Sequence, residues 1–112
     1  MWRIEFHDAL LPEFEALAEP VKDELLAQLL RLREFGPTLG RPAVDTIKGS
    51  RVANLKELSF AAGGGVWRVL FAFDERRVAV LLAAGDKAGV AQDRFYRRLV
   101  AIAEARWERG RA

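Results

Sequence analysis

The sequence predicts an α+β protein in which an N-terminal strand and two helices precede a three-strand antiparallel meander and a C-terminal helix. Three observations support this order. Apolar residues alternate with period two at the start of the chain, repeat at helical spacing over residues 21–32, and form two nearly continuous runs at 66–73 and 78–84. Because helices and strands are grouped along the chain, we expect a small sheet with the helices packed on one face.

Composition is typical of one folded domain, and we expect residues 1–112 to form it, since 51% of them are hydrophobic and 30% charged. The chain has no cysteine, which excludes disulfides and thiolate chemistry and fits a reducing cytoplasm. No apolar run reaches the roughly 20 residues of a membrane span. The first residues carry acids where a signal peptide would be basic and then apolar. A cytoplasmic protein without membrane contact is therefore expected.

The N-terminal third is expected to hold one strand and two helices. The strand covers "WRIEFH", residues 2–7, and lies at or next to a sheet edge. Asp8 is a candidate cap for a helix over residues 9–18. Pro20 starts a longer helix that Gly36 and Pro37 end. Its buried stripe is predicted to be Val21, Leu25, Leu29 and Leu32.

The remaining elements follow from turn residues and apolar spacing. The glycines and prolines of residues 36–51 indicate a loop, and residues 61–65 indicate a flexible turn. The last helix is expected over residues 92–107, with Phe95, Leu99 and Ile102 in one row and Tyr96, Val100, Ala103 and Trp107 in the next. Strands are expected over residues 54–60, 66–73 and 78 onward.

Two cations stand out in the predicted hairpin. If residues 74–77 form its turn, Phe73 pairs with Val78, and Arg68 stands across from Ala83 on the face away from the helices. Continuing the alternation places Lys87 on the same side. A guanidinium and an ammonium that converge on small side chains are suited to a phosphate.

A purely structural alternative exists for both cations, in which Arg68 pairs with Glu57 on the neighbouring strand and Lys87 is solvated. The arginines after Asp93 also have two interpretations. With a net charge of +2 and a sequence pI near 9.4, they favour an anionic partner, or they form the solvated face of the last helix.

Other chemistries fit the sequence poorly. The carboxylates of Asp45, Asp74, Asp86 and Asp93 fall in separate loops without ligand spacing, so no metal or other cofactor is expected. The glycine run at residues 63–65 precedes a strand, whereas a phosphate-binding loop precedes a helix. The three tryptophans fall on apolar faces and are expected in the core.

The motifs "GPTLGRPAVDTIKGSRVANLKELSF", "VWRVLFAF" and "LLAAGDKAG", followed by Tyr96, resemble the HigB-like, phage-derived branch of the RelE/ParE superfamily of type II toxins. The resemblance covers nearly the whole chain. It implies a RelE-like toxin fold and ribosome-dependent cleavage of messenger RNA, so the chain is expected to be an endoribonuclease that inhibits translation.

The resemblance also implies site residues. Arg68 would contact the scissile phosphate, Lys87 would stabilise the developing charge, and Tyr96 would act on the 2′-hydroxyl or stack on a base. From helix spacing alone, Tyr96 caps the core equally well. Tyrosine has a reference pKa of about 10, so it would serve as an acid or base only if neighbouring cations lowered that value. Contacts with RNA are assigned to Lys48, Arg51, Lys56, Arg94 and Arg97.

The implied partners are a cognate antitoxin of helix-turn-helix type, the ribosome and its mRNA, and operator DNA bound through the antitoxin. One departure keeps alternatives open: the chain reads "ELS" with Ser59, where relatives in this branch tend to read "ELR". A ParE-like toxin that binds DNA gyrase and cuts no RNA, or an inactive RNA-binding or regulatory module on the same fold, would fit that change.

Overall fold

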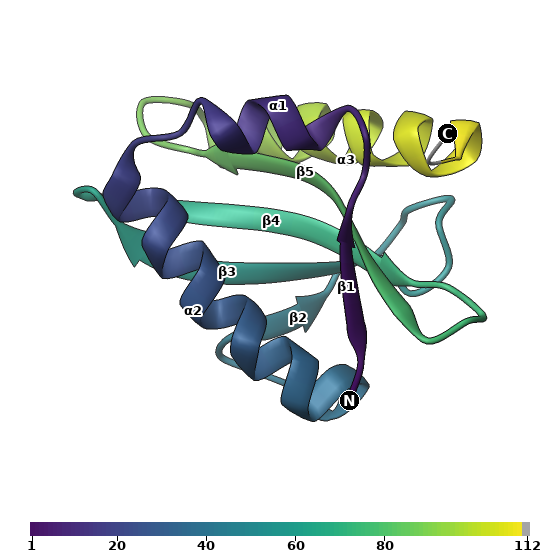
Figure 1. Ribbon diagram of the computed structural model, residues 1–112. Coiled ribbons are helices and arrows are strands. Elements are labelled where there is room, and N and C mark those ends of the chain that lie inside the picture. The colour runs from purple at the N-terminus through teal and green to yellow at the C-terminus, as the bar shows by residue number, and fades with distance from the viewer. Residues whose placement is uncertain (111–112) are drawn as a thin grey trace.

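A five-stranded sheet forms the centre of the computed structural model, which describes residues 1–110 (Figure 1). The strand order is β1-β5-β4-β3-β2, with β1 parallel to β5 and every other pair antiparallel. The strands are β1 (Arg3–Phe6), β2 (Val44–Thr46), β3 (Lys56–Ala62), β4 (Gly65–Phe73) and β5 (Val78–Asp86). The helices are α1 (Leu10–Glu15), α2 (Glu19–Phe35) and α3 (Gln92–Arg109), with a short 3-10 turn η1 at Gly36–Thr38.

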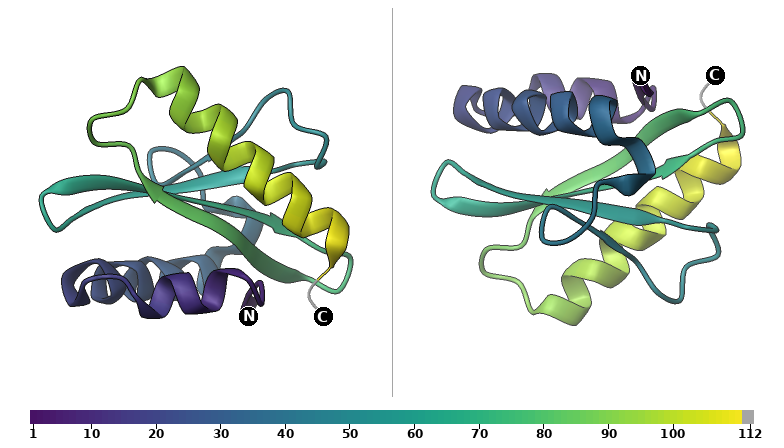
Figure 2. Two further views of the ribbon diagram at one scale, coloured as in Figure 1. Left: turned by 90° about the horizontal axis from the view of Figure 1, so that it is seen from above. Right: turned by 90° about the horizontal axis from the view of Figure 1, so that it is seen from below.

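Helices cover both faces of the sheet. Helices α1 and α2 lie on one face and α3 lies on the other (Figure 2). The α+β class and the predicted element order are confirmed, but the expectation that all helices share one face is wrong. The physical reason is visible in β5, whose residues are apolar on both sides, so each face needs a cover.

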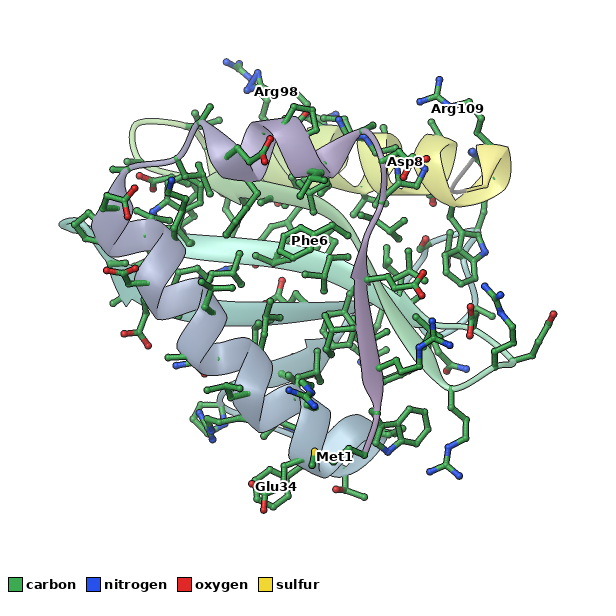
Figure 3. The ribbon with its side chains drawn as sticks, in the orientation of Figure 1. Met1, Phe6, Asp8, Glu34, Arg98 and Arg109 are labelled. Carbon is green, nitrogen blue, oxygen red and sulfur yellow. The ribbon has the colours of Figure 1, made fainter. Side chains whose placement is uncertain are left out.

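The first apolar layer joins α1 and α2 to the sheet. The predicted stripe of α2 is confirmed, because Val21, Leu25, Leu29 and Leu32 are its buried residues. They pack against sheet residues that include Leu58 and Phe71. Figure 3 shows Phe6 of β1 lying over this face, where its ring meets that of Phe14 with centroids 4.8 Å apart.

The second apolar layer joins α3 to the other face. Phe95, Leu99 and Ala103 of α3 pack against Leu70 and Val80 of the sheet. Ile102 of the first predicted row is 36% exposed, whereas Ala103 of the second row lies in the core. Figure 3 shows Arg98 and Arg109 projecting outward from α3, so at least these two arginines belong to a solvated face.

The β4–β5 register differs from the prediction. Phe73 pairs with Ala79, not Val78, because the turn has three residues, 75–77, one fewer than predicted. The Asp74 backbone N–H donates to the Val78 carbonyl at 2.9 Å, and Arg77 has φ 68°. Asp74 stabilises this turn by accepting hydrogen bonds from the backbone N–H groups of Arg76 and Val78 at 2.9 and 3.1 Å. An αL residue after a type I turn is a common three-residue hairpin geometry.

A bulge further along the hairpin changes the register again. Phe71 pairs with Leu81 and Leu70 with Ala83, so Leu82 has no partner on β4. Its carbonyl instead accepts a hydrogen bond of 2.8 Å from the Arg106 guanidinium of α3. Because the turn shifts the register by one residue, Val78, Val80 and Leu82 face α3, whereas the prediction placed them with Phe71 on the opposite side.

Two smaller expectations are also wrong. The predicted loop over residues 36–51 contains η1 and the edge strand β2, which pairs with β3 through Val44 and Leu58. Asp8 does not cap α1, because Ala9 occupies the cap position and its backbone N–H donates to His7 Nδ1 at 3.0 Å.

Candidate active site

Arg68 lies on the α3 face of the sheet, near the middle of β4. It stands across from Ser59 of β3 and Gly85 of β5, whereas the prediction placed it across from Ala83. The shifted turn and the bulge at Leu82 each move the register by one residue and together cause this change. Gly85 lies on the same face as predicted, and Phe95 of α3 fills the space above it, so a Cβ there would come within 3.0 Å of the Phe95 ring.

Arg68 does not stand clear of its surroundings. Its side chain is only 18% exposed, and its Nε donates a hydrogen bond of 2.8 Å to the Tyr96 hydroxyl. The Glu57 carboxylate lies 3.9 Å from the same Nε. The fold therefore brings together the predicted pair Arg68 and Tyr96, and it also forms the Arg68–Glu57 pair of the structural alternative.

Tyr96 is held in its neutral form. Burial raises the pKa of its hydroxyl above the ordinary value, and the Glu57 carboxylate raises it further, while Arg68 only partly opposes both effects. Tyr96 would act as a base only if neighbouring cations lowered its pKa, and here the pKa is raised instead. The protonated hydroxyl is suited to donating a proton.

Glu57 is the residue that sequence reasoning did not assign to the site. One of its carboxylate oxygens, Oε2, is buried without a hydrogen-bond partner, which is costly for an ionised group and uncommon in folded proteins. The signal was present in the strand alternation, because Glu57, Ser59 and Arg68 share one face of the sheet.

A cleft of about 730 Å³ opens beside this group. It lies between α3 and the segment that follows β2, and both Glu57 and Tyr96 line it. Its ionisable lining residues comprise two cations, four carboxylates and one phenol: Lys48 and Arg97; Asp45, Glu57, Asp93 and Glu104; and Tyr96.

Lys87 lies just beyond β5, at the approach to α3. Its ammonium donates a hydrogen bond of 3.3 Å to the side-chain carbonyl of Gln92, and Gln92 lines the cleft. Lys87 is thus joined to the rim of the cleft through the first residue of α3. Lys87 itself is half-buried, and its hydrogen bond to Gln92 is exposed to solvent.

The five residues assigned to RNA contact are not all brought together. Lys48 and Arg97 line the cleft. Arg51 is held by Glu104 and Glu108 of α3, and Arg94 is exposed on that helix without lining the cleft. Lys56 shares the α2 face with Leu58, where its ammonium donates to the Thr46 hydroxyl at 3.3 Å.

Neither a metal cluster nor a membrane-spanning helix occurs in the described part of the chain. Residues 1–110 hold no group of three or more histidine, aspartate or glutamate side chains placed to bind a metal ion. Over the same residues, no helix combines the length and apolar character needed to cross a bilayer.

Solved structures share this fold. A mutant of the Escherichia coli toxin RelE in the free state superposes with a TM-score of 0.65, covering 94% of this chain and 96% of that one at 14% identity. The isolated E. coli RelE toxin superposes with a TM-score of 0.53 over 90% and 97% of the two chains, at 15% identity. The fold is therefore the RelE-like toxin fold.

Sequence relatives define the family. A protein named as the toxin HigB3 of Mycobacterium tuberculosis (strain ATCC 25618 / H37Rv) is 43% identical over 103 residues, which are 88% of each chain. The toxin HigB2 of the same strain is 56% identical over 59 residues, which are 52% of this chain and only 29% of HigB2. The family model "Phage derived protein Gp49-like" matches residues 12–108. The chain therefore belongs to this Gp49-like family, to which its HigB-like sequence relatives point as well.

Proposed function

We propose that the chain is the toxin of a type II toxin-antitoxin pair and inhibits translation by cutting mRNA on the ribosome. The observation that carries the proposal is the contact between Arg68 and Tyr96 at 2.8 Å, beside a cleft, in a chain of the HigB-like family. The relatives and the fold give no support to the gyrase-binding alternative.

Cleavage through the RNA 2′-hydroxyl needs a proton acceptor, charge stabilisation at the phosphorane and a proton donor. Arg68 supplies charge at the phosphate, and Lys87 approaches from the rim of the cleft. Glu57 is assigned as the acceptor of the 2′-hydroxyl proton, since it lines the cleft beside Arg68. Tyr96, with its raised pKa, is assigned as the donor to the leaving 5′-oxygen. The products are a 2′,3′-cyclic phosphate and a free 5′-hydroxyl.

The charge of the cleft supports the dependence on the ribosome. Its four carboxylates outnumber its two lysine and arginine side chains, so free RNA, a polyanion, is attracted only weakly. Ribosomal RNA contacts through Arg94 and Arg97 would hold the toxin in place while the ribosome presents the codon. The proposed target places the activity in the cytoplasm.

The proposed partners follow from the family. A type II toxin requires a cognate antitoxin, and we assign a helix-turn-helix protein that also binds operator DNA on behalf of the pair. An acidic segment covering the arginines of α3 would neutralise the toxin directly.

The test in cells is a map of mRNA 5′ ends shortly after induction of the chain in bacteria. New ends at in-frame codon positions that disappear in Arg68→Ala and Lys87→Ala are expected. Growth arrest without new ends would contradict cleavage and favour a gyrase target.

A further inference from the structure

The segment between β2 and β3 forms one wall of the cleft and is fastened at two points. Its ends are joined by a hydrogen bond of 2.8 Å from the Ile47 backbone N–H to the Leu55 carbonyl. Its tip, Lys48–Arg51, extends toward α3. We call this tip the wall loop.

Glu104 of α3 holds the wall loop. Its Oε2 accepts hydrogen bonds from the Arg51 backbone N–H at 2.8 Å and from the Ser50 hydroxyl at 2.9 Å. Its Oε1 lies 3.4 Å from the Arg51 guanidinium. The Ser50 hydroxyl oxygen in turn accepts a 3.0 Å bond from the backbone N–H of Val52, a buried residue.

Glu104 is unusual for a surface helix. Only 8% of its surface is exposed, and the Arg51 backbone N–H is the main reason that its pKa lies below the ordinary value, against the effect of burial. Tyr96, Val100 and Glu104 are spaced four residues apart and all line the cleft. One helix face therefore carries both the tyrosine of the proposed site and the carboxylate that fastens the opposite wall.

We propose that Glu104 is a positioning residue, which sets the width of the cleft by fastening the wall loop to α3 and so places Lys48 opposite Tyr96 for RNA. The inference rests on the proposed function, because it concerns how that same cleft receives RNA. Glu108 is the matched comparison. It lies four residues further along α3 and pairs with the exposed Arg51 side chain at 3.0 and 3.2 Å, but the hydrogen bonds of the loop backbone and Ser50 go to Glu104.

Two substitutions at one position separate the hydrogen bonds from the charge. Glu104→Gln and Glu104→Ala both remove one negative charge from the cleft, but only glutamine keeps an oxygen that can accept from Arg51 and Ser50. Amide hydrogen exchange of the Arg51 backbone reports whether the loop is fastened. It is expected to rise in Glu104→Ala and stay near the wild-type rate in Glu104→Gln, with the amides of β4 and β5 unchanged in both.

The functional readout is kcat/KM for cutting mRNA on programmed ribosomes. The kcat/KM of the Glu104→Ala variant is expected to be about tenfold to a hundredfold lower than that of Glu104→Gln, since small displacements of positioning groups have effects of this size. Equal kcat/KM in the two variants, with fast Arg51 exchange in the alanine variant, would overturn the inference and leave the proposed function standing. An inactive wild-type chain would instead overturn both.

A second pair of variants, with smaller changes, tests the same inference if Glu104→Ala does not fold. Ser50→Ala removes one of the two hydrogen bonds and Glu108→Ala removes neither. In Ser50→Ala, the Arg51 backbone amide is expected to exchange faster and kcat/KM to be lower. In Glu108→Ala, both are expected to stay near the wild-type values. Faster exchange with unchanged kcat/KM would count against positioning by Glu104.

Discussion

Replacing Tyr96 with phenylalanine isolates the role of one hydroxyl. The ring remains, together with its edge contact to Phe95 at a centroid distance of 5.3 Å, while Arg68 Nε loses its acceptor. A single hydrogen bond to a charged group contributes about 1.5–3 kcal/mol to stability. At this half-buried site, the loss of stability is expected near the lower end of that range. A typical domain remains folded after a loss of that size.

The effect on catalysis is expected to be much larger. Proton donation by a positioned side chain typically contributes about 10²–10⁴-fold to the rate. Single-turnover cleavage of mRNA on programmed ribosomes should therefore slow by about that factor in Tyr96→Phe, with circular dichroism showing a folded chain.

Val100→Ala is the control for this experiment, because Val100 also lines the cleft on α3 but has no group that transfers a proton. It should cleave at nearly the wild-type rate. If Tyr96→Phe also retained most of the wild-type rate, Tyr96 would have only a structural role, and proton donation to the leaving oxygen would have to be assigned elsewhere.

Three further predictions concern stability. Leu25→Ala, at a position 1% exposed, should lower the free energy of unfolding by about 2–5 kcal/mol in urea denaturation, whereas Leu26→Ala, at 48% exposure, should change it by about 0.5 kcal/mol or less. Gly36→Ala should destabilise by more than about 1 kcal/mol, because Gly36 has φ 55° and a Cβ there would collide with the Trp2 indole. Folding lowers the pKa of Glu104, so its ionised carboxylate stabilises the folded state. This contribution is fully present above the pKa of the unfolded carboxyl and is lost as the pH falls through the lower pKa of the folded state. Glu104→Gln should remove this part of the acid dependence, and unchanged acid denaturation curves would contradict it.

Elements with strong local signals could be predicted from the sequence. The stripe of α2 was predicted residue by residue, because helical spacing and a proline and glycine at its two ends all agree. A family resemblance suggested Arg68 and Tyr96 as residues of one site, and the fold brings the two side chains into contact. From helix spacing alone, Tyr96 could equally have capped the core.

The hairpin register could not be predicted, because it depends on two local features that apolar alternation does not encode. One is the αL conformation of Arg77, which lacks the usual glycine or asparagine signal. The other is the bulge at Leu82, stabilised by Arg106 from a helix 24 residues away. The same limit applies to the wall loop, whose partners Ser50 and Glu104 are 54 residues apart.

Glu57 illustrates a different limit. Sequence reasoning named it as a structural partner of Arg68, and that contact exists. Its candidacy as a proton acceptor depends on its position in the lining of the cleft and on the raised pKa of Tyr96 beside it. Both are properties of tertiary packing, which spacing along the chain does not reveal.

The most direct test of the proposed function is cleavage of one defined mRNA by the purified chain, with and without programmed ribosomes, comparing wild type with Arg68→Ala. The proposal predicts cuts within codons only when ribosomes are present, and none with Arg68→Ala. Equal cleavage by wild type and Arg68→Ala, or efficient cleavage of the same mRNA without ribosomes, would contradict it.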